Sequence, residues 1–451
     1  MESLDTTILN TAVPTIAAAL HVVPLSMKAV LSSYTLSLAV FIPISGWVAD
    51  RFGTRRVFAS AIGLFTLGSV LCGVSTHIHA LVAFRILQGC GGAMMVPVGR
   101  LTMVRTFEKS ELIRAMSFVA IPGLIGPMLG PMAGGFIVGY FHWSVIFFLN
   151  LPIGLMGLIL VYLHLPDYRE KSNPLNVIGL VLFGSGIALL SYVLEVFGEH
   201  ELSVNQILTL LAISIVLLAA YGWQASRTRF PLLRLDLFRI RTFRAAVSGG
   251  FFTRLGLGGI PFILPLLYQV GLGFTPIQSG LLIMPQALGA MALKFFVQRV
   301  LSTFGYRTVL ISNTLLIGVL IFLFATIGVG TPVWVIAILA FCSGFFNSLQ
   351  YSSMNTLVYA DLTEEQTSGG STIASTGQQM SISFGIASAS LAIAMFIPDR
   401  YHTTAPEMIA GIHRALIVLG GVTILSAMVF RGLRRSDGDS TSLHKSVHDG
   451  E

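Results

Sequence analysis

Two oppositely charged residues, Asp5 and Arg85, lie within apolar segments of this sequence. An arginine at the centre of a membrane-spanning helix costs about 2.5 to 3.5 kcal/mol, so Arg85 needs a partner or a water-filled cavity. Asp5 is the one acidic residue clearly inside a neighbouring apolar segment of the N-terminal half. A carboxylate beside a permanent cation can exchange a proton when its surroundings change, so we predict that this pair couples proton movement. A purely structural or snorkelling arginine is the alternative.

The sequence contains none of the common enzyme motifs. Gly-x-x-x-x-Gly-Lys, His-Glu-x-x-His and Gly-x-Ser-x-Gly are all absent. The three cysteines, Cys72, Cys90 and Cys342, have no metal-binding or redox spacing. We therefore expect a protein that is not an enzyme and uses no cofactor and no metal, with an ion gradient as the energy source for any transport.

The composition indicates a polytopic membrane protein. Of the 451 residues, 54% are hydrophobic and 10% are charged, against about 25% charged residues in a typical soluble domain. Because a span needs about 20 apolar residues, the sequence predicts fourteen, near 4–20, 26–48, 57–76, 79–103, 113–138, 143–164, 175–197, 205–225, 245–270, 276–297, 308–328, 332–357, 370–397 and 412–431.

The distribution of basic residues predicts the orientation. With the loop at 49–56 inside, most Lys and Arg residues fall in inside loops and the C-terminal segment, and a count of twelve or thirteen spans would break this asymmetry. The net charge of +7 is therefore explained by cytoplasmic loops, and we exclude nucleic acid as a partner. We expect a cytoplasmic C-terminus and no cleavable signal peptide.

The loop between the second and third predicted spans carries a charged motif, Gly-x-x-x-Asp-Arg-x-Gly-x-Arg-Arg, made by Gly46, Asp50, Arg51, Gly53, Arg55 and Arg56. Glycine allows the positive φ of a tight turn, and the aspartate can cap or face a helix N-terminus. An ordinary positive-inside loop would explain the arginines but not the paired glycines. The motif resembles the loop between the second and third spans of the major facilitator superfamily, where it acts in conformational change.

The fifth predicted span contains a run of helix-breaking residues at 126–135. Prolines bend a helix and glycines allow close helix packing, so generic small-residue packing is one interpretation. The pattern Gly-x-x-x-Gly-Pro-x-x-Gly-Gly also resembles the antiporter motif of the same superfamily, with Gly126, Gly130, Pro131, Gly134 and Gly135 at its positions. That resemblance favours export over uptake.

With the stretches at 4–10 and 146–154, these motifs make the chain resemble the fourteen-span drug:proton antiporter family of that superfamily. The resemblance implies an all-α major facilitator fold with two six-helix halves (1–164 and 245–433), two inserted helices (175–225) and a disordered cytoplasmic tail (434–451). The first-span acid and fourth-span arginine that the family uses in proton coupling match Asp5 and Arg85. Family members continue apolar residues before that acid, so we expect the first span to be N-terminally truncated here, with the true start upstream or with an impaired proton site.

The implied function is proton-driven export of drug-like small molecules by a monomer in the lipid bilayer of the bacterial inner membrane. Candidate residues of a substrate cavity in the second half are Arg254, Gln286, Asn347 and Asn355, each of which could instead serve helix packing. The spans of that half offer no acidic residue to bind a hydrophobic cation. Efflux of organic anions, carboxylates or metal chelates by the same mechanism is therefore an alternative, and a passive channel or a membrane receptor is another.

Overall fold

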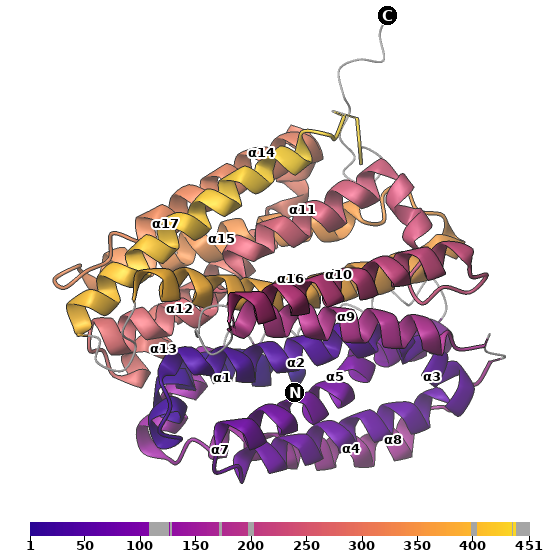
Figure 1. The fold of residues 1–451 in the computed structure, drawn as a ribbon, viewed down its shortest axis with the longest axis horizontal. Helices are drawn as coiled ribbons and strands as arrows, with labels where there is room; N and C mark the ends of the chain where they lie inside the picture. Colours follow the sequence, from indigo (N-terminus) through magenta and orange to yellow (C-terminus); the bar gives the residue numbers. More distant parts are fainter. Residues whose placement is uncertain are drawn as a thin grey trace, which may run out of the picture. The chain divides into compact units, whose positions relative to one another are not determined.

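The computed structural model describes residues 1–107, 126, 129–170, 174–196, 203–397, 404–434 and 436–438. Every regular element within these ranges is a helix (Figure 1). Twelve of these helices are long and apolar enough to cross a membrane. The helix Glu2–Ala19 accounts for the first predicted span. The shorter apolar helix Leu129–Tyr140 overlaps the end of the fifth predicted span, whose residues 113–125, 127 and 128 lie outside the described residues. The prediction of an all-helical polytopic membrane protein is confirmed.

The chain forms two compact units. Unit 1 comprises Met1–Leu232 with Thr275–Gly280, and unit 2 comprises Leu233–Phe274 with Leu281–Glu451. The helices of unit 1 are α1 (Glu2–Ala19), α2 (Lys28–Phe41), α3 (Ser45–Phe52), α4 (Thr54–Gly73), α5 (Ile78–Thr106), the helix Leu129–Tyr140, α7 (Val145–Phe148), α8 (Asn150–His164), α9 (Val177–Val196) and α10 (Val204–Arg227). Within this unit, α5 packs against α2 and α4, and α4 also packs against α8.

Unit 2 is built around α11, which contacts α15, α16 and α17. Its helices are α11 (Arg241–Leu257), α12 (Ile260–Leu266), most of α13 (Pro276–Leu293), α14 (Val297–Phe324), α15 (Val333–Leu357), α16 (Glu364–Phe396) and α17 (Ala405–Phe430). In the same unit, α14 packs against both α15 and α17.

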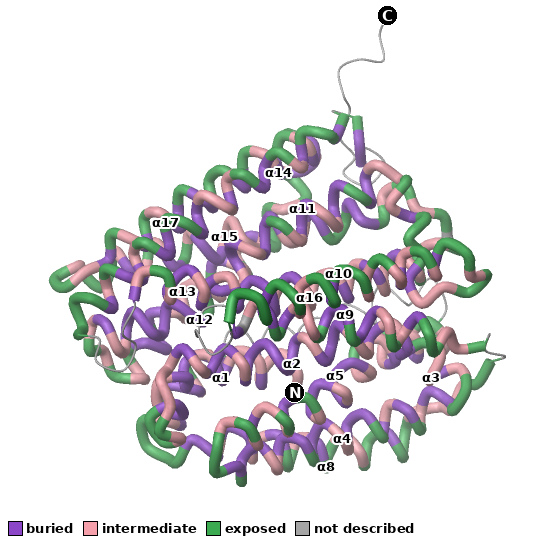
Figure 2. The backbone as a smooth tube through the Cα atoms, viewed as in Figure 1, coloured by how far each residue is buried: buried purple, intermediate pink, exposed green. Residues whose placement is uncertain are grey.

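One narrow face of α10 is buried, and its other residues are half-buried or exposed (Figure 2). Its buried residues, Ile207, Ser214, Tyr221 and Ala225, repeat at helical spacing. This face packs on α9, where the Ser214 hydroxyl donates to the Gly186 carbonyl at 2.9 Å. An apolar helix that buries so little of its surface matches the expectation for a helix facing lipid.

The predicted loop at 49–56 is shorter than the sequence suggested. Asp50 and Arg51 lie in the last turn of α3, and α4 begins at Thr54, so Gly53 alone breaks the helix. Its φ of 98° is the left-handed geometry that favours glycine. The sequence Phe-Gly-Thr-Arg at 52–55 recurs as Phe-Gly-Tyr-Arg at 304–307. Gly305 of this second stretch also has a positive φ, 68°, which interrupts α14.

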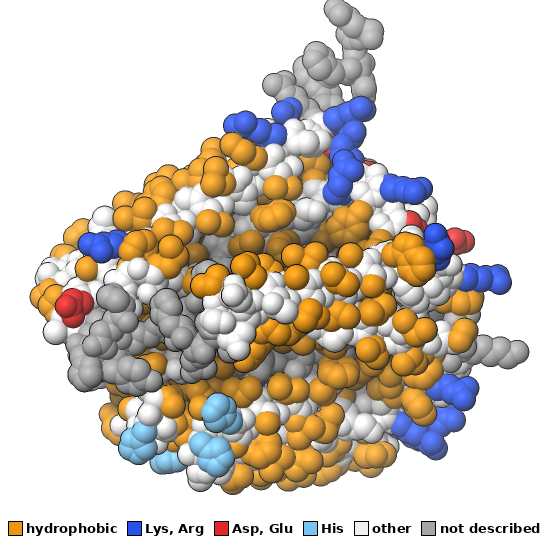
Figure 3. All heavy atoms as spheres, viewed as in Figure 1, with side chains coloured by type: hydrophobic (Ala, Val, Ile, Leu, Met, Phe, Trp, Pro, Cys, Tyr) orange, Lys and Arg blue, Asp and Glu red, His pale blue; other side chains and the backbone are white. Residues whose placement is uncertain are grey.

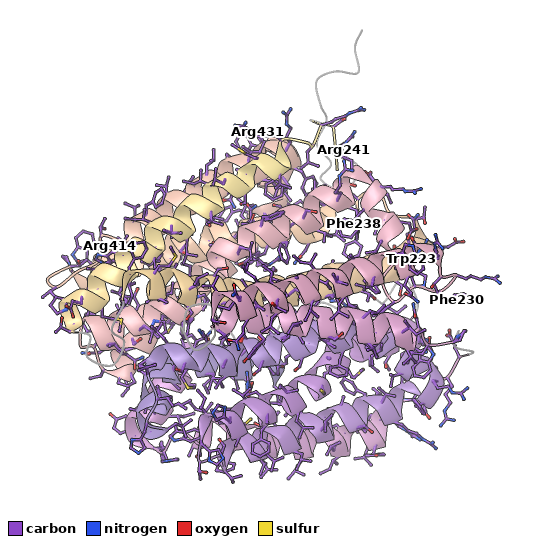
Figure 4. The ribbon with its side chains drawn as sticks, in the orientation of Figure 1. Trp223, Phe230, Phe238, Arg241, Arg414 and Arg431 are labelled. Atoms are coloured by element: carbon purple, nitrogen blue, oxygen red, sulfur yellow. The ribbon has the colours of Figure 1, made fainter. Side chains whose placement is uncertain are left out.

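The two ends of unit 1 differ in their charged and titratable side chains. In Figure 3 the Lys and Arg side chains of this unit gather at one end and His side chains at the other. Exposed arginines at the Gly53 end are Arg51, Arg56, Arg100 and Arg169, and exposed histidines in the opposite loops are His21, His77 and His142. In unit 2, Arg241 and Arg431 lie at one end and Arg414 at the other (Figure 4). Both distributions follow the charge asymmetry from which we predicted the orientation.

Residues just after α17 pack back onto unit 2, although we expected disorder from residue 434 onwards. The Arg241 side chain donates two hydrogen bonds to Asp437, one of them from Nε at 2.8 Å. The Arg434 amide donates to the same carboxylate at 2.8 Å, and Gly438 lies on the Tyr306 ring. Arg434, Asp437 and Gly438 thereby connect the end of the described chain to the beginning of α11 and to α14.

Candidate functional site

Asp5 and Arg85 form a buried ion pair in unit 1. The Arg85 Nη1 donates to Asp5 Oδ2 at 2.5 Å, and each side chain is 1% exposed. The guanidinium also donates through Nε to the Val30 carbonyl at 3.3 Å and lies 4.3 Å from the centre of the Tyr34 ring. The structure therefore brings together the two residues that we predicted as a pair.

Two amide side chains complete the surroundings of Asp5. Gln88 Nε2 and Asn150 Nδ2 both donate to Asp5 Oδ1, at 3.0 and 2.9 Å. Gln88 Oε1 accepts from Arg85 Nη1 at 2.7 Å, so the glutamine bridges both members of the ion pair. Three donors on one carboxylate match an ionised acid, which only accepts hydrogen bonds.

Glycines let the helices around this pair approach closely. A Cβ at Gly68 of α4 would lie 2.8 Å from the Gln88 backbone, and a Cβ at Gly91 of α5 would lie 2.6 Å from the Phe65 amide nitrogen. On the α2 side, a Cβ at Gly89 would lie 2.6 Å from the Ser37 side chain. Close contact on both faces of α5 excludes water, so Asp5 and Arg85 depend on each other for charge compensation.

The predicted antiporter motif packs on the helix that carries Asp5. A Cβ at Gly126 would meet Ser3 and Leu4, one at Gly130 would meet Thr7, and one at Gly134 would meet the Ile8 carbonyl. The Thr7 hydroxyl also donates to the Gly126 carbonyl at 3.2 Å. These three glycines, spaced four residues apart, form a stripe against α1.

The other two residues of that motif, Gly135 and Pro131, have different neighbours from the three glycines. A Cβ at Gly135 would meet the Pro276 carbonyl in the segment that belongs to unit 1. Pro131 lies between Gly130 and Gly134, and its backbone is close to Gly280. Residues 127 and 128 of the motif lie outside the described residues.

The charged motif at the Gly53 end forms a network with a segment that we had not predicted to take part. Asp50 accepts from Arg105 Nη2 at 2.8 Å, and Arg105 also pairs with Glu170 at 3.0 Å. The carboxylate at the beginning of α4 is Asp167, which accepts from the Arg55 amide at 3.2 Å. The expectation that Asp50 could cap a helix is thus replaced by an interhelical ion pair, because Asp167 occupies the helix N-terminus.

The remaining motif positions have simple surroundings. A Cβ added to Gly46 would meet nothing within 4 Å, whereas one at Gly53 would collide with Asp167. Arg51 and Arg56 are exposed. Glycine is therefore required at position 53 for two reasons: the backbone has a positive φ, and the Asp167 side chain leaves no room for a Cβ.

Arg254 is a buried cation in unit 2, 6% exposed. Its guanidinium carbon lies 4.7 Å from the centre of the Tyr351 ring, and its Nη1 would lie 2.8 Å from a Cβ at Gly250. Among the described residues it forms no hydrogen bond or ion pair through its side chain. A buried arginine compensated by one aromatic ring is a candidate contact for an anionic group.

The other three predicted cavity residues differ from Arg254. The Gln286 carbonyl is in tight contact with Gly344 of α15. Asn347 donates to Ser343 Oγ at 3.3 Å, and its own Oδ1 is buried without a partner among the described residues. Asn355 is exposed. Only Asn347 keeps an unused buried polar atom.

Sequence reasoning missed five residues that the structure adds to these sites: Gln88, Asn150, Arg105, Asp167 and Glu170. Gln88 follows Arg85 by three residues, which places both on one helix face. Asn150 is a lone polar residue in an apolar stretch, which was a usable signal. Arg105 and Asp167 lie far from Asp50 and Gly53 in sequence, and nothing local indicates their contacts.

The helical architecture and the buried ion pair define a multi-pass membrane protein of the transporter class. The profile of the Major Facilitator Superfamily matches residues 1–386 and again 246–448. The chain belongs to the major facilitator superfamily and is a membrane transporter.

Relatives named multidrug resistance protein MdtD are similar over most of their length. The protein of Serratia proteamaculans is 39% identical over 430 residues, covering 95% of this chain and 90% of the relative. That of Pectobacterium atrosepticum is 41% identical over 398 residues, covering 88% and 85%. That of Yersinia enterocolitica is 38% identical, covering 98% and 94%. The resemblance to this part of the superfamily is confirmed.

Solved structures share the fold at low sequence identity. A POT family transporter in complex with 5-aminolevulinic acid has a TM-score of 0.71 and 13% identity, with 98% of this chain and 94% of that chain covered. The human organic anion transporter MFSD10 has a TM-score of 0.63 and 15% identity, with 95% and 96% covered. These likenesses support the fold alone.

Proposed function

We propose that this protein is a proton-coupled secondary exporter of drug-like small molecules in the bacterial inner membrane, with a cytoplasmic C-terminus. The observation that carries the proposal is the Asp5–Arg85 ion pair, in which each side chain is 1% exposed. The names of the similar relatives support a drug-like substrate.

In this mechanism Asp5 binds the proton and Arg85 supplies the fixed counter-charge. An ionised Asp5 neutralises Arg85, whereas a protonated Asp5 leaves a buried cation uncompensated, so the two protonation states favour different surroundings. Arg85 is seven residues from the beginning of α5, or about 10 Å along the helix. In the predicted orientation the beginning of α5 faces outwards. A proton driven inwards would therefore have only this short distance to travel before it reaches the ion pair.

The glycine stripe and the charged Gly53 turn support a change of conformation around this pair. Gly126, Gly130 and Gly134 bring their helix against α1 without intervening side chains, so α1 can transmit a shift at Asp5 directly. The Asp50–Arg105 pair links α3 to α5 at the predicted cytoplasmic end. In the superfamily, two halves rock around a central site, and these contacts would change in that motion.

Proton flux in everted membrane vesicles tests the proposal. Substrates added to vesicles that contain the full chain should move protons in the wild type, and Asp5→Asn and Arg85→Ala should abolish this flux. Gly222→Ala on α10 is the matched control, since its Cβ has open space. Substrate movement that persists without proton flux in the wild type would contradict antiport and indicate a passive channel.

Arg254 favours a second candidate function, export of organic anions or metal chelates by the same antiport mechanism. Its side chain is buried without a carboxylate among the described residues, so an anionic group on the substrate would relieve an unpaired charge. Citrate-like anions and cationic dyes in the same vesicle assay distinguish the two substrate classes. Loss of anion flux alone in Arg254→Gln would support the anion, and equal loss of both would contradict it.

A further inference from the structure

Asp5 is connected through two side chains and one backbone carbonyl to Phe147, whose ring contacts a tryptophan near the end of unit 1. Asn150 Nδ2 donates to Asp5 Oδ1 at 2.9 Å and to Ser69 Oγ at 3.0 Å. The Ser69 hydroxyl donates to the Phe147 carbonyl at 2.8 Å. The Phe147 ring meets Trp143 edge-on, with ring centres 6.1 Å apart.

Every member of this chain of contacts is withdrawn from solvent. Asn150 is 2% exposed, Ser69 and Phe147 are 0% exposed, and Trp143 is 4% exposed. A buried hydrogen bond that is broken cannot be replaced by one to bulk water, so each group must find another partner within the chain. A change at Asp5 is therefore passed to its neighbours.

The direction of the hydrogen bonds depends on the charge of Asp5. An ionised carboxylate accepts from Asn150, so the amide presents its N–H groups to Asp5 and Ser69. A proton on Asp5 Oδ1 turns that oxygen into a donor, which needs an acceptor. A half-turn of the Asn150 amide presents its oxygen, which then accepts from both Asp5 and Ser69. The only atom added is the proton on Asp5, and the Ser69 hydroxyl leaves the Phe147 carbonyl.

We propose that Asn150 and Ser69 are positioning residues that transmit the protonation of Asp5 to the α7 segment beside Trp143. This inference rests on the proposed function, in which Asp5 binds the proton. The Phe147 carbonyl, which then loses the Ser69 hydroxyl and keeps its backbone contact with the Leu149 amide, lies in α7, the single turn between the loop at Trp143 and α8. Its release loosens the junction between the loop and α8 each time Asp5 is protonated.

The chain offers a reporter at the end of this relay. It has four tryptophans, so Trp47→Phe, Trp223→Phe and Trp334→Phe together leave Trp143 as the single source of tryptophan fluorescence. The His142 ring lies beside Trp143 with ring centres 5.3 Å apart and a tilt of 37°. Histidine is the residue type whose charge most readily changes between pH 5 and 8, so His142→Gln belongs in the reporter background.

Other ionisable groups lie around Asp5, and the experiment must separate their pH-dependent signals from that of Asp5. These are Glu2 of α1 with the N-terminal amine beside it, Tyr34 of α2, Cys72 of α4 and Arg85 of α5. A pH-dependent signal that belongs to Asp5 disappears in Asp5→Asn, whereas a signal from any of the others remains.

The experiment follows Trp143 emission against pH in the purified full chain. We expect a single transition in the reporter protein, its loss in Asp5→Asn and in Ser69→Ala, and its return in Ser69→Thr, which restores the hydroxyl. Ser75→Ala is the matched control and should keep the transition, since Ser75 donates only to Cys72 at the same end of α4. A transition that survives in Ser69→Ala would overturn the relay.

Vesicle proton flux in the same variants separates this inference from the proposed function. Flux that depends on Asp5 while Trp143 stays silent to pH overturns the relay and leaves the function standing. Flux that is unchanged in Asp5→Asn overturns the function itself. Should Asp5→Asn fail to fold, the contrast between Ser69→Ala and Ser69→Thr still decides.

Discussion

Arg85 in unit 1 and Arg254 in unit 2 are both buried arginines on long helices, yet their surroundings differ. Arg85 has a carboxylate at 2.5 Å and an amide at 2.7 Å. Arg254 has the Tyr351 ring at 4.7 Å and, within the described chain, no counter-charge. In the proposed mechanism a cation of the first kind responds to a proton, because Asp5 can be neutralised in place. A cation of the second kind can only be compensated by something that arrives, so we expect it to respond to a solute.

The largest effect should follow from removing the paired cation. Arg85→Leu leaves Asp5 buried without its partner, and breaking a buried pair in this way costs about 3 to 5 kcal/mol in the free energy of unfolding. Denaturant titration of the purified protein measures the loss, and proton flux should disappear with it. Arg85→Lys keeps the charge and should recover part of the stability. An unchanged unfolding midpoint in Arg85→Leu would mean that the pair does not hold unit 1 together.

A smaller loss should follow from separating the Asp5 helix from its glycine neighbour. In Gly134→Ala the new Cβ would collide with the Ile8 carbonyl, and such overpacking costs about 1 to 3 kcal/mol. Thermal unfolding measures this change, with Gly46→Ala as the control that adds a methyl to open space. Equal midpoints for the two variants would contradict the close approach on α1.

Removal of Arg254, the cation without a carboxylate among the described residues, should change the stability far less than removal of Arg85. Arg254→Leu removes a buried charge that has no carboxylate among the described residues, so we expect the free energy of unfolding to stay within about 1 kcal/mol of the wild type, with the lost Tyr351 contact offset by relief of desolvation. Denaturant titration beside Arg85→Leu makes the comparison direct. A loss as large as that of Arg85→Leu would show that Arg254 has a counter-charge after all.

The smallest effect concerns the Arg241–Asp437 pair at the end of unit 2. Burial would raise the pKa of Asp437, but hydrogen bonds from Arg241 and the Arg434 amide outweigh it and hold this pKa below its ordinary value of 3.8. Because the native pKa is the lower one, the pair stabilises the fold fully above pH 3.8 and loses that contribution as pH falls through the native pKa.

Asp437→Asn should therefore lower the free energy of unfolding by about 1 kcal/mol or less at neutral pH, since Arg241 is partly exposed. The difference from the wild type should vanish in strong acid. Unfolding measured at pH 7 and below pH 3.8 checks both statements, and Asp236→Asn, which breaks an exposed pair with Arg234, is the control. A difference that grows on acidification would have the wrong sign.

Much of the fold followed from local patterns, whereas the sites followed only in part. Apolar runs predicted the helices, and the placement of arginine predicted that Asp50 and Gly53 mark one end. The pairing of Asp5 with Arg85 could be predicted because a lone charge in an apolar helix needs a partner. The hydrogen bonds of Asn150 to Asp5 and of Asp167 to the Arg55 amide could not be predicted, because each joins residues more than 100 positions apart.

The sequence by itself determined the membrane class, the family and the identity of the residues that must be charged inside the bilayer, because hydrophobicity and charge act through composition and spacing. Only the tertiary structure decided that the Asp5 carboxylate accepts from three donors while the Arg254 guanidinium has no acceptor among the described residues, and that Asp167 rather than Asp50 lies at the beginning of α4. Hydrogen bonds depend on distances of a few tenths of an ångström between separate helices. Such distances are fixed by how the helices pack and not by any one of them.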